Sequence, residues 1–134
     1  MSGETTLTLV GNLTADPELR YTTSGTPMVS FTVASTPRSV DRTTGQWTDG
    51  EALFLRCTAW RALAEHTAAS LHCGARVLVS GRVRQRSFTT TEGEQRTVVE
   101  IDADEVGPSL RYATALVTKA ASRATADTGG SEPV

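Results

Sequence analysis

The chain has few aromatic residues and almost no lysine. Aromatic side chains make up 5% of its 134 residues, and every basic residue except Lys119 is an arginine. The formal net charge is −2 and the pI is about 5.7, so overall charge does not indicate a polyanionic partner. Because arginine suits planar, bidentate and stacked contacts with phosphates and bases, the positions of the arginines are more informative than their number.

Long apolar runs are also missing. No segment is long enough to span a bilayer, and the N-terminal MSGETTLTLV lacks the basic residues and the continuous apolar stretch of a secretory leader. The sequence therefore predicts a soluble, cytoplasmic protein. We expect one folded domain over residues 1–119, which is long enough for a hydrophobic core, and a short disordered tail over residues 120–134.

The groupings typical of metal sites and enzymes are absent as well. Cys57 and Cys73 lie sixteen residues apart and match no metal-binding spacing, and neither His66 nor His72 belongs to a set of metal ligands. We expect the cysteines to be reduced and partly buried, with a disulfide within or between subunits as the alternative. The sequence has no catalytic triad and no phosphate-binding glycine motif, so we predict neither an enzyme nor a cofactor or metal.

Alternating apolar and polar residues predict a chain made mainly of strands. One example is MVSFTVAST, in which Val29, Phe31 and Val33 fall on one face. Residues 61–74 instead repeat apolar positions every four residues and predict the one helix, with Gly74 as its stop. The breakers in residues 12–27 indicate an extended loop, and residues 37–52 indicate a long hairpin loop.

The order of these elements predicts the fold. Three strands, one helix and two further strands give the layout of an OB-fold, an all-β, five-stranded, partly open Greek-key barrel with its helix between strands three and four. An SH3-like barrel would lack that helix, and a ferredoxin-like fold would need a helix between its first two strands. Residues 110–120 are compatible with either a last strand or a short helix.

Residues 53–60 contain the strongest functional signal. As a strand they place Leu53, Leu55, Cys57 and Ala59 on one face and Phe54, Arg56, Thr58 and Trp60 on the other. A face of aromatic and cationic side chains is a poor core and a poor water-facing surface. It suits nucleic acid, because bases stack on aromatic rings while guanidinium groups contact phosphates.

Two other segments extend this pattern. Residues 81–88 place three arginines and an aromatic residue on one face, namely Arg82, Arg84, Arg86 and Phe88. The polar hairpin loop carries Arg38, Arg42 and Trp47 and is a candidate flap over a ligand. The alternatives are a solvated strand face for the arginines and a subunit-packing role for Trp47.

These motifs resemble those of bacterial single-stranded DNA-binding proteins of the tetrameric OB-fold type, over about residues 5–118. The motifs are LVGNLTADPELRYTTSGTPMVSFTVA, TTGQWTDGEALFLRCTAWRALAE and GARVLVSGRVRQRSF. The resemblance implies sequence-independent binding of single-stranded DNA, with stacking on Phe54, Trp60 and Phe88, by a nucleoid-associated homotetramer. GQWTDGEALFLRC and EVGPSLRYATALV resemble the actinobacterial branch, which implies an extra C-terminal strand within residues 110–117 that clamps neighbouring subunits.

The chain departs from that family at two places. TPRSVDR has no aromatic residue where the family's long loop begins with one, and GGSEPV lacks the family's acidic, partner-recruiting tip. We therefore expect an accessory paralogue in replication, recombination, repair or chromosome handling, without recruitment of proteins through the tail. An OB-fold RNA-binding protein and a protein–protein assembly module that has lost nucleic-acid binding remain open alternatives.

Overall fold

The computed structural model describes residues 4–36 and 38–121. Its elements follow one another along the chain as β1 (Thr6–Leu13), β2 (Glu18–Tyr21), β3 (Pro27–Ser35), β4 (Arg38–Val40), β5 (Trp47–Asp49), β6 (Leu53–Trp60), α1 (Ala62–Ser70), β7 (Arg76–Thr89) and β8 (Gln95–Pro108). The predicted tail of residues 120–134 falls almost entirely outside the described residues, as does its GGSEPV end.

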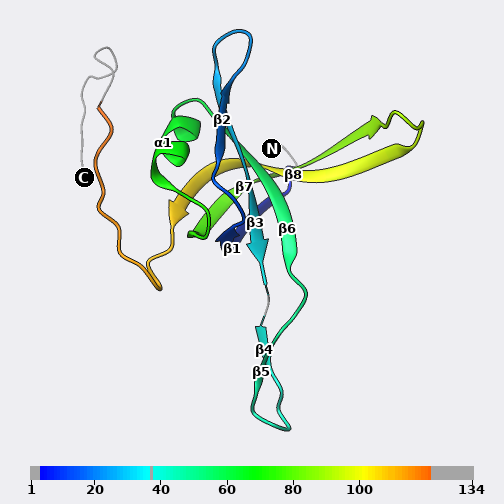
Figure 1. Cartoon of the computed structure of the whole chain (residues 1–134), viewed down its shortest axis with the longest axis vertical. Helices are drawn as coiled ribbons and strands as arrows, with labels where there is room; N and C mark the ends of the chain where they lie inside the picture. The colour runs from blue at the N-terminus through cyan, green and yellow to red at the C-terminus, as the bar shows by residue number, and fades with distance from the viewer. Residues whose placement is uncertain (1–3, 37, 122–134) are drawn as a thin grey trace.

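The strands form a barrel with one helix packed against it (Figure 1). They lie in the order β1-β7-β8-β6-β3-β2, and a further pairing of β1 with β3 closes the sheet. Strand β6 runs parallel to β8, whereas the other pairings are antiparallel. Because α1 lies between β6 and β7, the third and fourth strands of the closed ring, the structure confirms the predicted OB-fold.

The core is built from the inward-facing residues of the strands. Val29, Phe31 and Val33 of β3 are buried, as their alternation predicted, and they pack with Val79 of β7 and Ile101 of β8. Burial of such side chains supplies most of the favourable free energy of folding. Because the core uses one side of each strand, the residues on the other side remain exposed and can contact a ligand or another chain.

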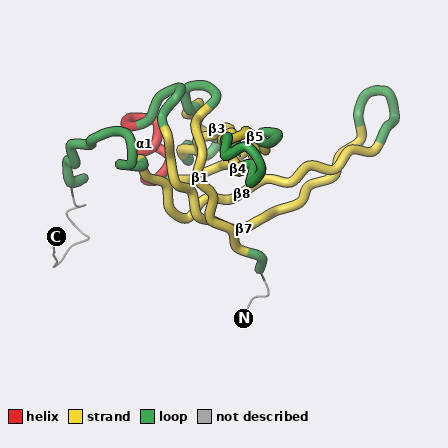
Figure 2. Tube along the Cα trace, turned by 90° about the horizontal axis from the view of Figure 1, so that it is seen from below, coloured by secondary structure: helices red, strands yellow, loops and turns green. Residues whose placement is uncertain are grey.

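Two hairpins extend beyond the barrel. The β4–β5 hairpin continues the ribbon of β3 and β6, and the far halves of β7 and β8 reach out to one side in both views (Figures 1 and 2). The β7–β8 hairpin turns at Gly93, whose φ of 86° favours glycine. Each hairpin therefore carries side chains that the barrel itself does not bury.

A β-bulge in β8 depends on Gly81. The β7–β8 register shifts at Ser80 and Gly81, so that Gly81 lies opposite Ala103 and Ser80 lies opposite Glu105, with Asp104 as the extra residue. A Cβ atom at Gly81 would collide with the backbone carbonyl oxygen of Asp102. The close approach of the two strands at this point therefore requires glycine.

Two local predictions were wrong. Residues 18–21, expected as loop, form β2, because their backbone pairs with β3. The helix ends at Ser70 rather than beside Gly74, since Leu71 turns to an extended conformation and packs in the core, and Gly74 lies in the following turn. Residues 110–117 pair with no strand of the described chain, and the strand expected there, which would clamp a neighbouring subunit, stays a prediction.

Candidate nucleic-acid interface

Strand β6 presents two large aromatic side chains to solvent. The exposed fractions of Phe54 and Trp60 are 61% and 40%, whereas Cys57 and Ala59 on the opposite face are fully buried. The alternation that buries one face of the strand must expose the other. The structure therefore places Phe54, Arg56 and Trp60 together on the outward side of the sheet, as predicted.

Phe88 adds a third exposed ring on the β7–β8 hairpin. Its exposed fraction is 41%, and the Arg86 guanidinium lies 5.8 Å from the ring centroid in a cation–π contact. Strand β8 separates β7 from β6 in the sheet. We use "binding face" for the outward side of these three strands, which carries Phe54, Arg56, Trp60, Arg82, Arg84, Arg86 and Phe88.

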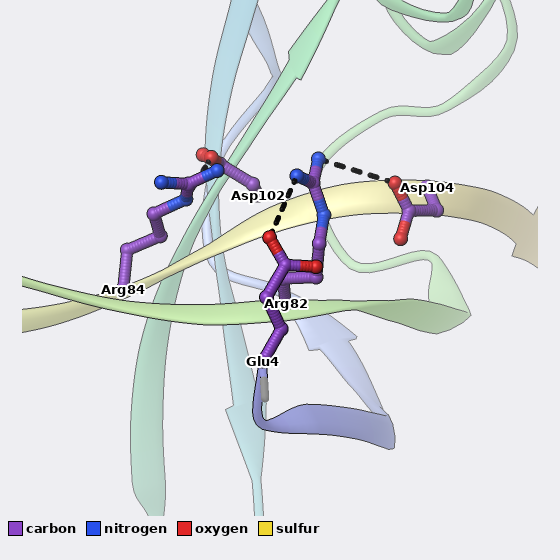
Figure 3. Close-up of polar contacts among 5 residues, drawn as sticks. All are labelled: Glu4, Arg82, Arg84, Asp102 and Asp104. Carbon is purple, nitrogen blue, oxygen red and sulfur yellow. Dashed lines mark ion pairs between the residues drawn. The ribbon is translucent and has the colours of Figure 1, made fainter. Parts of the chain in front are cut away.

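The three arginines of β7 on this face are paired with carboxylates, and Figure 3 shows the pairs of Arg82 and Arg84. The ion pairs join these atoms: Arg82 Nη1 and Glu4 Oε2, 3.8 Å; Arg82 Nη2 and Asp104 Oδ1, 3.3 Å; Arg84 Nε and Asp102 Oδ2, 2.6 Å; and Arg86 Nη2 and Glu100 Oε2, 2.8 Å. The arginine stripe seen in the sequence is therefore not a free cationic patch.

Two other arginines near Trp60 keep their side chains unpaired. Within the described residues, neither Arg56 nor Arg61 makes an ion pair or a side-chain hydrogen bond. Arg61 lines a hollow of about 550 Å³ with Trp60, Arg82, Asp102 and the hydroxyl-bearing residues Thr22, Ser24 and Thr26. This hollow offers an aromatic wall, a free cation and hydroxyl groups beside one another.

The candidate flap residues lie apart from the barrel, on the β4–β5 hairpin. Arg38 stands in β4 opposite Asp49, Arg42 is exposed in the turn, and Trp47 is exposed in β5. The hairpin pairs only with itself in the described chain. It joins the ends of β3 and β6, and it therefore lies next to the Phe54 end of the binding face.

Two further arginines lie near the binding face and were not predicted from the sequence. Arg96 lies directly opposite Phe88 in the β7–β8 register, a position that alternation along β8 could have indicated. Arg61 has a φ of 62° and a ψ of −133°, a conformation that L-residues other than glycine rarely adopt. No sequence pattern announces that conformation, because it depends on how the end of β6 meets α1.

The cysteines differ sharply in their environments, and both are free thiols. Cys57 is buried in the core, and this burial raises the pKa of its thiol to about 12. Cys73 is exposed, and its Sγ donates a hydrogen bond to the Thr14 carbonyl oxygen at 3.4 Å. Both cysteines are reduced, as expected, but neither is partly buried, since Cys57 is fully buried and Cys73 is exposed.

The described part of the chain contains no candidate metal site and no candidate membrane-spanning helix. Its histidine, cysteine, aspartate and glutamate side chains form no group of three that could hold a metal ion. Within residues 4–36 and 38–121, no helix is long and apolar enough to cross a membrane.

Comparison with known proteins gives a consistent result. Residues 5–109 match the model of the single-strand binding protein family. The chain is 65% identical over 133 residues to the single-stranded DNA-binding protein of Mycobacterium tuberculosis, covering 99% of this chain and 80% of that protein. It is 67% identical over 120 residues to the protein of the same name from Mycolicibacterium smegmatis, covering 90% and 73% of the two chains.

A solved structure is similar as well. The crystal structure of a small single-stranded DNA-binding protein from Streptomyces coelicolor aligns with a TM-score of 0.70 and 37% sequence identity, over 81% of this chain and 96% of that one. These relatives come from actinobacteria, as the sequence motifs predicted. The chain belongs to the single-strand binding protein family.

Proposed function

We propose that the chain binds single-stranded DNA without sequence preference, through its binding face. The observation that carries the proposal is the exposure of Phe54, Trp60 and Phe88 on one side of the sheet, among arginines. Bases stack on such rings whatever their identity, because every base has a π-face, and each stacked base contributes on the order of 1–3 kcal/mol. A duplex keeps its bases paired inside and cannot use these rings.

We assign phosphate contacts to the arginines of the binding face and to Arg61, which lines the hollow beside Trp60. Arg56 and Arg61 are free to take a phosphate without losing an existing partner. Arg84 and Arg86 use one nitrogen each toward a carboxylate, so their remaining N–H groups stay available. Neutralised phosphates release counterions, and affinity should therefore fall as salt rises. Arg38, Arg42 and Trp47 would add contacts if the β4–β5 hairpin lies along the strand.

We also propose that the working form is a homotetramer that serves processes exposing single strands, such as replication, recombination, repair and chromosome handling. In the described chain Leu110, Leu116 and Val117 are highly exposed, which is unfavourable for apolar side chains unless another surface covers them. Light scattering coupled to size-exclusion chromatography tests the assembly. A purely monomeric mass at micromolar concentration would refute it.

Intrinsic tryptophan fluorescence tests the DNA-binding proposal. The chain has two tryptophans, so Trp47→Phe leaves Trp60 as the one reporter. We expect oligo-dT to quench Trp60 strongly, salt to weaken the effect, and a duplex of equal length to quench little. Absence of quenching by oligo-dT, or equal binding of duplex, would refute the proposal. A matched RNA strand in the same titration shows whether binding is restricted to DNA.

A further inference from the structure

The arginine row of β7 is neutralised by its neighbours. Arg82, Arg84 and Arg86 are paired with four carboxylates, one from Glu4 and three from β8. We use "carboxylate row" for those three residues of β8: Glu100, Asp102 and Asp104. The cluster of three arginines and four carboxylates carries no net positive charge. A surface built solely to attract a polyanion would not be arranged in this way.

The carboxylate row runs through the middle of the binding face. Strand β8 lies between β6, which carries the rings of Phe54 and Trp60, and β7, which carries the arginines. Glu100 stands opposite Arg84 on one side and beside Arg56 on the other, and Asp102 stands between Arg82 and Thr58. Asp102 also lines the hollow beside Trp60. Negative charge therefore lies between the rings of Phe54 and Trp60 on β6 and the arginines of β7, for which we use "arginine strip".

Stability explains this arrangement only in part. The Arg84 and Arg86 side chains are 52% and 60% exposed, whereas their partners Asp102 and Glu100 are 26% and 21% exposed, and ion pairs with one group open to solvent contribute only modestly to folding. The pairing also leaves donors unused, because a guanidinium has five N–H groups and the Arg84 guanidinium pairs with a single carboxylate, that of Asp102. The arginines can therefore still accept a phosphate that approaches from the side away from the carboxylate row.

We propose that Glu100 and Asp102, aided by Asp104, determine the preference of this face for single strands over duplex. The inference rests on the proposed function. A single strand can turn its bases over the carboxylate row toward the rings and keep its phosphates on the arginine strip. A duplex presents a dense array of phosphates and no free base face, so it meets repulsion along the centre of the site without gaining stacking.

The test uses isosteric neutral substitutions. The double variant Glu100→Gln/Asp102→Asn removes two negative charges from the face. The control variant Glu65→Gln/Glu105→Gln changes net charge equally, at two exposed carboxylates that make no ion pair in the described chain. Fluorescence anisotropy gives the Kd of labelled oligo-dT and of a mixed-sequence blunt duplex for each protein, at low salt. Circular dichroism and light scattering check that fold and assembly are retained.

We expect the affinity for duplex to rise about tenfold or more in the double variant. Removal of one charge that lies close to a like charge in water lowers the Kd by roughly fivefold, and the double variant removes two such charges. Oligo-dT affinity should rise much less, so that the ratio of the two Kd values falls. The control should leave this ratio unchanged. The single variants Asp102→Asn and Glu100→Gln should each give part of the effect, and they serve as the test if the double variant does not fold.

Two results would overturn the inference. An unchanged ratio would mean that the carboxylates do not select between strand forms. A loss of oligo-dT affinity with no gain for duplex would mean that they act only to hold the arginines in place. If the wild-type chain binds no oligo-dT, the proposed function itself fails, and that outcome is visible before any variant is compared.

Discussion

Arg61→Gly should make the protein more stable while it weakens DNA binding. Arg61 sits at the junction of β6 and α1 with a φ of 62° and a ψ of −133°. A non-glycine residue in such a conformation costs on the order of 1–3 kcal/mol. Glycine removes that cost but loses about 0.5–1 kcal/mol through the greater freedom of the unfolded chain. The net expectation is a gain of about 1 kcal/mol.

The contacts of this residue support that estimate. Its backbone N–H donates to the Pro27 carbonyl oxygen at 2.9 Å and its carbonyl accepts from the Glu65 N–H at 3.2 Å, and glycine keeps both. The side chain makes no ion pair or hydrogen bond in the described structure that its removal would lose. A gain of about 1 kcal/mol corresponds to a rise in Tm of roughly 4 °C for a domain of this size.

Arg61→Ala is the matched control. Alanine removes the same cation but keeps the Cβ atom, so it retains the strain, and its Tm should not rise. Both variants should bind oligo-dT more weakly, with the salt dependence reduced by about one phosphate contact. Thermal unfolding at a fixed protein concentration and a salt titration measure the two effects. A glycine variant no more stable than the alanine variant would refute the strain argument.

Three further predictions concern the scaffold. Gly81→Ala should lower the free energy of unfolding by about 1–3 kcal/mol or more, because the added Cβ meets the backbone of β8. Gly107→Ala should change that free energy little, because the space around Gly107 is open. Urea unfolding of the two variants compares these effects. Cys73 should react quickly with a thiol reagent at neutral pH and Cys57 slowly, as its burial and its pKa of about 12 require. Because the raised pKa favours the neutral thiol in the folded state, the stability from Cys57 is complete below pH 9 and declines toward pH 12, so Cys57→Ala, unlike Cys73→Ala, should flatten the alkaline loss of Tm. Equal reactivity of the two thiols, or identical alkaline profiles, would contradict this account.

The sequence was most informative where a strand has one buried face. Alternation with a period of two residues indicates which side of a strand is buried. The buried and exposed sides of β3 and β6, and with them the exposure of Phe54 and Trp60, could therefore be predicted without coordinates. The same reasoning separated the helical segment from the strands. Element order then indicated the OB-fold, because few barrels place a helix at that point.

Features that depend on cross-strand register could not be predicted in this way. The carboxylates of β8 appear in the sequence as ordinary surface residues, and only the pairing of β7 with β8 brings Asp102 to Arg84. Strand β2 was missed because ELRY is short and polar, and its pairing with β3 comes from tertiary structure. The bulge at Gly81 and the φ of Arg61 likewise follow from how separate segments meet.

The central claim is that bases stack on the exposed rings of the binding face. It is tested most directly by the oligo-dT affinity of Trp60→Ala and Phe54→Ala, compared with Tyr21→Ala as a control. Arg20 of β2 lies opposite Met28, which lies opposite Trp60, so Arg20 is on the side of the binding face and the exposed ring of its neighbour Tyr21 is on the other side of the sheet. We expect each of the first two substitutions to raise the Kd by roughly 5-fold to 100-fold and the third to leave it nearly unchanged. An unaltered Kd for Trp60→Ala, with fold and assembly intact, would contradict the stacking mechanism.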